Sequence, residues 1–291
     1  MYAIVGITGQ VGGAIARNLL AQGKSVRAIV RDATKGDVWA GKGCEVALAD
    51  INDAVTLRAA FEGMDGVFIM LPPIFDPSPG FPEAKAAIES LSIALSAAEP
   101  ARVVCLSTIG GQLERPNLLN QLHMMETALG KIGLGVTFLR PAWFMENMTW
   151  DVAPARDAGI IASFLQPLDK PVPMVATADI GKAAAQLLTM DAQPLRVVEL
   201  EGPQRITPND IGAAFSKVLA KTVTMQAVPR ASWESLFRSQ GMNNPLPRMQ
   251  MLDGFNEGWI EFEGGEANSE KGLTTIETVM RALVAAKSDS R

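Results

Sequence analysis

The sequence has little cysteine, histidine and tyrosine: its 291 residues include 2 cysteines, 1 histidine and 1 tyrosine. Two cysteines do not make a disulfide framework, so a reducing compartment is expected. Cys44 has no histidine or second cysteine near it in the sequence, which argues against a metal site. Cys105 lies within an apolar run and is expected to be a small core residue. No metal ion is predicted.

Long apolar runs are also missing, since none reaches the roughly 18 residues that a membrane span needs. The chain begins without the basic segment and cleavage site of a secretory signal. Its net charge of −5 argues against a nucleic-acid or anionic-membrane partner. With 48% hydrophobic and 20% charged residues, the chain can bury an ordinary core. A cytoplasmic protein is therefore expected, with a homodimer left open.

The first half of the chain alternates short apolar runs with segments of helical periodicity. The apolar runs predict strands at residues 3–6, 26–30, 45–49, 66–71, 102–107 and 136–140. The periodic segments between them include helices predicted at 53–61, 83–98 and 117–132. Short, almost continuously apolar strands separated by helices indicate a parallel sheet covered on both faces. We therefore predict a doubly wound α/β domain at 1–150.

The second half is less regular and predicts a smaller α/β domain for the substrate at 151–291. Its prolines and glycines suggest a long excursion at 150–175, followed by a helix at 177–189 that rejoins the first domain. Thr177 or Asp179 is expected to cap this helix, Thr207 a helix at 209–219, and Thr274 a last helix ending near Ala286. Further strands are predicted at 197–201 and 222–228.

The strongest local motif is the glycine-rich stretch GITGQVG at residues 6–12, between the first strand and the first helix. Glycines there allow a tight turn, close approach of the backbone to a pyrophosphate, and close packing of helix on strand. The spacing GxxGxxG is a variant of the dinucleotide-binding fingerprint. The alternative is a plain strand-to-helix turn. The motif predicts these cofactor contacts: Gly6, Thr8, Gly9, Gln10, Val11 and Gly12.

The ends of the following strands carry the other predicted cofactor residues. Arg31 follows the second strand, where an arginine accommodates the 2′-phosphate of NADP, although the neighbouring Asp32 would suit the 2′-hydroxyl of NAD. Asp50, after the third strand, either contacts the adenine or caps the helix near Asp53. Three further cofactor contacts are predicted at Leu71, Pro72 and Pro141. NADP(H) is favoured over NAD(H), and no flavin is expected.

Six motifs together resemble the NmrA-like branch of the short-chain dehydrogenase/reductase superfamily. They are GITGQVG at 6–12, VRAIVRD at 26–32, LSTIG at 106–110, LRPAWFMEN at 139–147, DIG at 179–181 and EGP at 201–203. The resemblance covers nearly the whole chain and implies a Rossmann domain, a smaller C-terminal domain and an NAD(P) site. Members of this family include quinone-type and azo-compound reductases, and also regulators that bind the nucleotide without turning it over.

The sequence departs from the wider superfamily at the usual Tyr-x-x-x-Lys pair, in which an activated tyrosine transfers the substrate proton. Its one tyrosine, Tyr2, begins the first strand, and the positions expected for the pair fall on Leu118 and Leu122. Alcohol–ketone chemistry is therefore disfavoured. Quinones and azo compounds fit better, because solvent can protonate the anion that hydride addition produces.

Two residues are candidates for catalysis and three for substrate contact. His123, the one histidine, could donate a proton, or it could be a helix histidine with no role. Ser107, at the end of the fifth strand, could bind substrate or nicotinamide, or it could satisfy backbone groups at the strand end. Substrate contacts are predicted, with core packing as the alternative for the two aromatic residues, at Trp143, Phe144 and Asn147.

These features predict an NADPH-dependent oxidoreductase that transfers hydride to a small quinone-like or azo acceptor. The alternative is a non-catalytic regulator that senses NAD(P) and binds a protein partner, which the missing Tyr-x-x-x-Lys pair fits equally well. An epimerase that retains its cofactor is a weaker third possibility, since transient oxidation of an alcohol needs the base that is absent. The fold cannot choose among the three.

Overall fold

The computed structural model describes residues 1–191 and 196–288. The chain divides into two compact units, and each unit is built from separate segments. Unit 1 contains Met1–Glu114, Leu119–Arg140 and Ile180–Val198, and unit 2 contains Arg115–Leu118, Pro141–Asp179 and Glu199–Arg291. The chain leaves unit 1 after Arg140, before the predicted limit at 150, and returns to it at Ile180, within the helix predicted at 177–189 to rejoin the first domain.

The main sheet has eight strands in the order β12-β10-β6-β5-β4-β1-β2-β3. Neighbouring strands from β3 to β6 run parallel, as do β10 and β12. Their bounds are β1 Tyr2–Val5, β2 Val26–Val30, β3 Glu45–Leu48, β4 Gly66–Ile69, β5 Val103–Leu106, β6 Val136–Pro141, β10 Arg196–Glu201 and β12 Glu270–Lys271. This arrangement confirms the predicted doubly wound α/β fold. The strand order reverses between β1 and β4, where such sheets bind ligands at the carboxyl ends of the strands.

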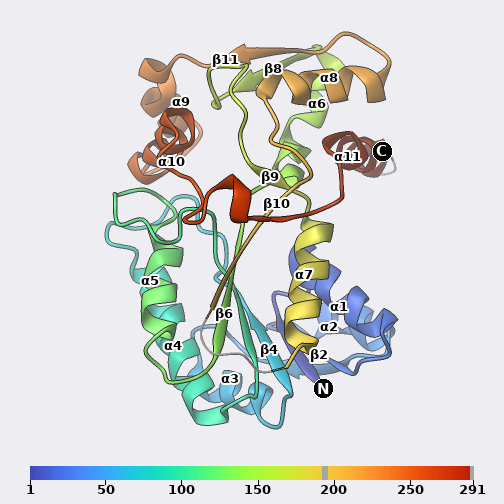
Figure 1. The fold of residues 1–291 in the computed structure, drawn as a ribbon, viewed down its shortest axis with the longest axis vertical. Coiled ribbons are helices and arrows are strands. Elements are labelled where there is room, and N and C mark those ends of the chain that lie inside the picture. The colour runs from blue at the N-terminus through green and yellow to red at the C-terminus, as the bar shows by residue number, and fades with distance from the viewer. Residues whose placement is uncertain (192–195, 289–291) are drawn as a thin grey trace. The chain divides into compact units, whose positions relative to one another are not determined.

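Helices cover both faces of the sheet in unit 1. Figure 1 shows α1, α2 and α7 on one face, and α3, α4 and α5 on the other. Their bounds are α1 Gln10–Ala21, α2 Ala33–Ala40, α3 Ala54–Phe61, α4 Pro82–Ala98, α5 Asn120–Leu129 and α7 Thr177–Thr189. The helix predicted at 117–132 is thus shorter at both ends than expected.

The core of unit 1 lies between the sheet and the helices α3, α4 and α5. Phe61, Leu91 and Met125 come from the three helices and are fully buried. Ile69 and Cys105 meet them from β4 and β5. The expectation that Cys105 is a core residue is confirmed, and burial raises the pKa of its thiol well above the ordinary value.

Close packing between α1 and α7 covers part of the other face of the sheet. A Cβ atom on Gly181 would lie 2.4 Å from the Cβ atom of Ala14 and 2.9 Å from its carbonyl carbon. Because that second contact is to backbone, a side chain at 181 would force the two helices apart. The glycine of the DIG motif therefore has a packing role inside unit 1.

Unit 2 contains two small sheets, one pairing β7 with β9 and the other pairing β8 with β11. The strands are β7 Trp143–Phe144, β8 Ile160–Ser163, β9 Met174–Val175 and β11 Thr224–Ala227. The helices are α6 Val152–Asp157, α8 Pro208–Leu219, α9 Trp233–Ser239, α10 Leu246–Glu257 and α11 Ile276–Ser288. The short 3₁₀ turns are η1 Met145–Trp150, η2 Arg230–Ser232 and η3 Glu266–Asn268. The excursion predicted at 150–175 begins at the last residue of η1 and contains α6, β8 and β9.

The helix caps of unit 2 agree only in part with the sequence. The predicted cap Thr207 is confirmed, because its hydroxyl accepts from Asp210 N–H at the beginning of α8 and the carboxylate of Asp210 accepts in return from Thr207 N–H. The prediction for Thr274 is wrong. Thr275 supplies the hydroxyl that accepts from Thr278 N–H, whereas Thr274 donates to the carboxylate of Asp179.

A partly buried carboxyl group in unit 2 makes stability depend on pH. Asp151 lies at the junction of η1 and α6, and burial raises its pKa from 3.8 to about 6. A raised carboxyl pKa means that the folded state binds the proton more tightly than the unfolded state. The free energy of unfolding should therefore fall as the pH rises from about 4 to about 6.

Replacing Asp151 with asparagine removes this titration. We expect the variant to be more stable than the wild type at neutral pH by up to about 3 kcal/mol, and no more stable below about pH 4. Urea denaturation across this pH range measures the difference. Asp37→Asn, on the exposed side of α2, serves as the control for the same substitution at a carboxyl that is not buried. A difference for Asp151→Asn that is constant with pH would contradict the prediction.

Candidate functional site

The turn between β1 and α1 brings three glycines of the glycine-rich stretch together. Gly6 has a φ of +71°, in the region that favours glycine. Gly9 N–H donates to Gly6 O at 2.9 Å. A Cβ atom on Gly12 would lie 2.3 Å from Gly6 O and 2.6 Å from Gly6 C. Residue 12 must therefore be glycine, because α1 begins directly against the backbone of the turn.

The amino-terminal end of α1 is open to an anion. Gly9 is the N-cap, and within the described chain no side chain caps this helix and its first turn carries no acidic residue. The first amide to bond along the helix is Gly13 N–H, which donates to Gly9 O at 2.9 Å. Thr8, Gly9 and Gln10 are exposed. Free amides at the positive end of a helix, next to a glycine turn, fit the pyrophosphate of a dinucleotide.

At the end of β2, Arg31 and Asp32 differ in what their side chains do. Asp32 caps α2, accepting from Thr34 N–H at 2.9 Å and from its hydroxyl at 2.8 Å. The hydrogen bond from the Thr34 hydroxyl, with that from its amide, holds the pKa of Asp32 below its ordinary value. Arg31 is exposed and forms no ion pair with any residue that the structure describes. The arrangement leaves the guanidinium available for a phosphate and favours Arg31 over Asp32 as the ribose contact.

At the end of β3, the structure separates the roles of two aspartates. Asp53 caps α3, accepting from Val55 N–H at 2.9 Å and Thr56 N–H at 3.3 Å. The alternative that Asp50 caps this helix is therefore wrong. Asp50 instead accepts from Asn52 N–H at 2.9 Å, and it remains exposed as a predicted adenine contact.

A cavity of about 220 Å³ lies beside the ends of β3 and β4. The predicted cofactor residues Leu71 and Pro72 both line it. Its other walls come from the loop after β3, from α4 and from α5, with Ile51, Asn52, Ile74, Glu83, Ala84, Ala86, Ala87 and Gln121. Mostly apolar walls with a few polar groups suit a flat heterocycle such as adenine. The contribution of α4 was not predicted, because its alanines carry no chemical signal in the sequence.

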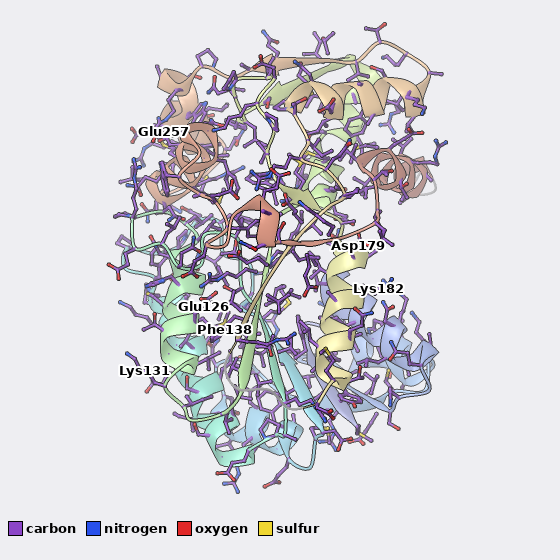
Figure 2. The ribbon with its side chains drawn as sticks, in the orientation of Figure 1. Glu126, Lys131, Phe138, Asp179, Lys182 and Glu257 are labelled. Carbon is purple, nitrogen blue, oxygen red and sulfur yellow. The ribbon has the colours of Figure 1, made fainter. Side chains whose placement is uncertain are left out.

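Three side chains meet at the carboxyl ends of β5 and β6. Figure 2 labels Glu126 on α5 and Phe138 on the neighbouring strand β6. The Glu126 carboxylate accepts from Arg140 Nε at 2.9 Å and from Arg140 Nη2 at 2.6 Å. It also accepts from the hydroxyl of Ser107. The side chains of Arg140 and Glu126 are only 5% and 10% exposed, so this is a buried, two-pronged ion pair.

His123 lies one turn before Glu126 on α5. Its Nδ1 is 2.8 Å from Gly111 O. A carbonyl only accepts hydrogen bonds, so Nδ1 carries the proton and Nε2 of the neutral ring is an acceptor. The position expected for a catalytic tyrosine, Leu118, precedes α5, while Leu122 lies on it. Tyr2 is buried in β1.

The predicted substrate contacts lie in unit 2, after β6 ends at Pro141. Trp143 and Phe144 form β7, and the Trp143 ring meets Phe255 edge-on with centroids 5.1 Å apart. The buried indole N–H of Trp143 has no hydrogen-bond acceptor among the described residues. Asn147 is exposed on η1. Trp143 therefore combines a packed ring with an N–H that remains to be satisfied.

Glu146, between these residues, has a role that the sequence did not reveal. Its carboxylate accepts from Thr177 N–H at 2.9 Å and from the Thr177 hydroxyl at 2.7 Å, at the beginning of α7. Burial raises the pKa of Glu146 in spite of these hydrogen bonds. Asp179, labelled on α7 in Figure 2, accepts instead from Thr274 N–H at 2.8 Å. The predicted caps Thr177 and Asp179 are thus engaged by other partners, and Glu146 caps the helix.

Two kinds of feature are absent from the described ranges 1–191 and 196–288. No group of three or more histidine, cysteine, aspartate or glutamate side chains is arranged to hold a metal ion. None of the described helices is long and apolar enough to cross a membrane.

Comparison with known proteins gives one matching family, two relatives in sequence and one solved structure with the same fold. The sequence pattern of the NmrA-like family matches residues 2–278. The chain is 27% identical over 251 residues to an NAD(P)H azoreductase of Xenophilus azovorans, covering 84% of this chain and 83% of the relative. It is 25% identical over 251 residues to quinone oxidoreductase 2 of Escherichia coli strain K12, covering 86% and 85%. A solved structure of an NADPH-dependent quinone oxidoreductase from Escherichia coli, complexed with NADPH, shares the fold with a TM-score of 0.81, at 23% identity and with 97% and 99% of the chains covered.

Proposed function

Because the chain belongs to the NmrA-like family, we propose that it is an NADPH-dependent oxidoreductase that reduces quinone-like or azo acceptors. The observation that carries this proposal is the β1–α1 turn, where Gly12 lies against the backbone of Gly6 and the end of α1 is uncapped. This arrangement fits a dinucleotide pyrophosphate. Relatives of similar length that are named as an azoreductase and a quinone oxidoreductase support the acceptor class.

Different residues of the chain bind the different parts of the nucleotide and the acceptor. The turn at residues 6–12 and the first amides of α1 hold the pyrophosphate, and Arg31 holds the 2′-phosphate. Leu71 and Pro72 hold the adenine in the 220 Å³ cavity that they line. Ser107 serves the nicotinamide end, and Trp143 with Phe144 orients a flat acceptor by stacking.

The reaction consumes one hydride and one proton for each quinone reduced to a hydroquinone. The reduced nicotinamide, when bound, supplies the hydride. The proton comes from solvent or from the imidazolium form of His123, which would release its Nε2 proton while Nδ1–H stays on Gly111 O and would then be reprotonated by solvent. No Tyr-x-x-x-Lys relay is available, since Tyr2 is the one tyrosine and lies buried in β1. Acceptors whose reduced anion takes a proton from water fit this arrangement.

The test of this function is nucleotide oxidation by the purified chain with quinones and an azo dye, with NADPH and NADH run in parallel. A separate titration measures the binding of each nucleotide. We expect turnover with a preference for NADPH. Tight nucleotide binding without turnover on any acceptor would favour the second candidate, a regulator that senses NAD(P), which the absence of the tyrosine–lysine pair also fits.

Replacing Arg31 with alanine tests the choice of nucleotide. The variant is expected to bind NADPH about tenfold to a hundredfold more weakly and NADH with unchanged affinity, because one or two charge-assisted hydrogen bonds to the 2′-phosphate are lost. Arg58→Ala, at an exposed arginine of α3, is the matched control and should change neither affinity. Equal losses for both nucleotides would contradict the assignment of Arg31.

A further inference from the structure

We propose that the Glu126–Arg140 ion pair makes Ser107 an obligate hydrogen-bond acceptor for its ligand, and that Ser107 receives the amino group of the nicotinamide carboxamide. This inference rests on the proposed nucleotide-binding function and assigns Glu126 and Arg140 as positioning residues within it. Neither was a predicted site residue.

The Ser107 hydroxyl has the carboxylate of Glu126 as its hydrogen-bond partner. A hydroxyl has one proton to donate and two lone pairs to accept with, whereas a carboxylate only accepts. In the hydrogen bond between the Ser107 hydroxyl and Glu126 Oε1, Ser107 must therefore be the donor. Its proton is engaged inside the protein, and only lone pairs remain for a ligand.

Arg140 fixes the carboxylate that holds this proton. Its Nε and Nη2 reach the two oxygens of Glu126 at 2.9 and 2.6 Å, so the carboxylate cannot rotate without breaking a bidentate contact. Arg140 Nη1 also donates to Gln112 Oε1 at 3.3 Å. With side-chain exposures of 5% and 10%, water competes little for these groups.

Gly111 packs against the same three side chains and restricts them further. A Cβ atom at this position would lie 2.5 Å from Glu126 Oε1, 3.0 Å from Ser107 Oγ and 3.0 Å from Arg140 Nε. The backbone of Gly111 therefore packs directly on the three side chains and leaves no room for another arrangement. A fixed carboxylate means a fixed direction for the lone pairs of Ser107.

The place of Ser107 in the sheet identifies the ligand group. The phosphate-binding turn follows β1 and Arg31 follows β2, which puts the adenosine on the β2–β3 side of the point where the strand order reverses. Ser107 directly follows β5, on the opposite side, where the nicotinamide end belongs. The carboxamide of that ring offers an amino group that donates and a carbonyl that accepts. An acceptor-only serine selects the amino group and so sets which way the carboxamide turns.

The experiment compares the binding of NADP⁺ with that of its 3-acetylpyridine analogue, in which a methyl group replaces the carboxamide amino group. Quenching of tryptophan fluorescence reports both affinities in the full chain without requiring turnover. The wild type is expected to bind the analogue about tenfold more weakly, because the analogue lacks the amino group and leaves the Ser107 oxygen without that hydrogen bond. Ser107→Ala should reduce this ratio to about one, and Ser107→Thr, which keeps the hydroxyl, should retain it.

Glu126→Gln provides a second variant, in which the amide can donate to Ser107 and free its hydroxyl to donate outward. The preference for NADP⁺ over the analogue should then disappear, with folding checked by circular dichroism. The inference would be overturned if the preference for NADP⁺ persists in Ser107→Ala, or if the wild type shows no preference. In either case, tight binding of NADP⁺ would leave the proposed function standing. A wild type that binds neither nucleotide would overturn both. If Glu126→Gln does not fold, the two Ser107 variants decide the question alone.

Discussion

Replacing Gly9 with valine is expected to weaken NADPH binding by at least about a hundredfold while the protein remains folded. Gly9 has extended backbone angles, φ −88° and ψ 177°, which any residue adopts. An added Cβ would meet only Gly6 O, at 3.3 Å. The branched side chain would instead stand over the exposed end of α1, where a pyrophosphate must approach the amides. Because valine is a poor N-cap, a loss of about 1 kcal/mol in stability is expected.

Gly12→Ala is expected to affect the stability of the protein more than its affinity for NADPH. Its Cβ would overlap the backbone of Gly6, so the variant should lose about 3 kcal/mol of stability. Gly41→Val, at the exposed end of α2, is the control and should bind NADPH as the wild type does. Fluorescence titration with NADPH and thermal unfolding measure the two effects separately. Normal NADPH affinity in Gly9→Val would remove the assignment of this turn as the phosphate site.

Replacing Arg140 with methionine should destabilise the protein by about 3 to 5 kcal/mol, because it leaves the carboxylate of Glu126 buried without its cation. Removing both charges should cost much less. The double variant Glu126→Leu with Arg140→Met is therefore expected to recover most of the lost stability. Urea denaturation of the single and double variants measures the coupling between the two residues.

A surface ion pair supplies the comparison for this result. Arg58 and Glu62 are 55% and 60% exposed and 3.4 Å apart, so Arg58→Met should cost less than about 1 kcal/mol. The difference between the two arginine variants measures the cost of leaving a carboxylate buried and unpaired. Similar losses at both positions would mean that the carboxylate of Glu126 is not desolvated as the geometry indicates.

The sequence predicted those features that depend on residues close together in the chain. The strand-to-helix turn at 6–12 and the parallel strands follow from local spacing and apolar runs. The role of Asp32 also had a local signal, since an aspartate two residues before Thr34 is a common helix cap. That signal was not used: the sequence favoured Arg31 over Asp32 as the ribose contact only because Arg31 directly follows the second strand.

Side-chain contacts between distant segments, and one of the small sheets, were not predicted. In the sequence, Glu126 cannot be told from any other polar residue of an amphipathic helix. Its role is visible only in the fold, where β5, β6 and α5 bring Ser107 and Arg140 within hydrogen-bond distance of it. Glu146 is similar, because it caps a helix that begins 31 residues later. Strand β8 has only four residues and pairs with the distant strand β11. In each case the information lies in tertiary contacts and not in spacing along the chain.

The chain passes from unit 2 back into unit 1 within α7. This crossing limits how the gene can be divided into fragments. A fragment ending near residue 140 or 150 would carry the nucleotide turn and the strands of the main sheet up to β6, but it would lack β10, β12 and the helical segment whose Gly181 packs on Ala14. That fragment would expose an apolar face of α1 and is expected to aggregate. Neither unit corresponds to a single stretch of the gene, so neither can be cut out or exchanged as a contiguous cassette. Recombination among relatives of this chain should preserve the two units together.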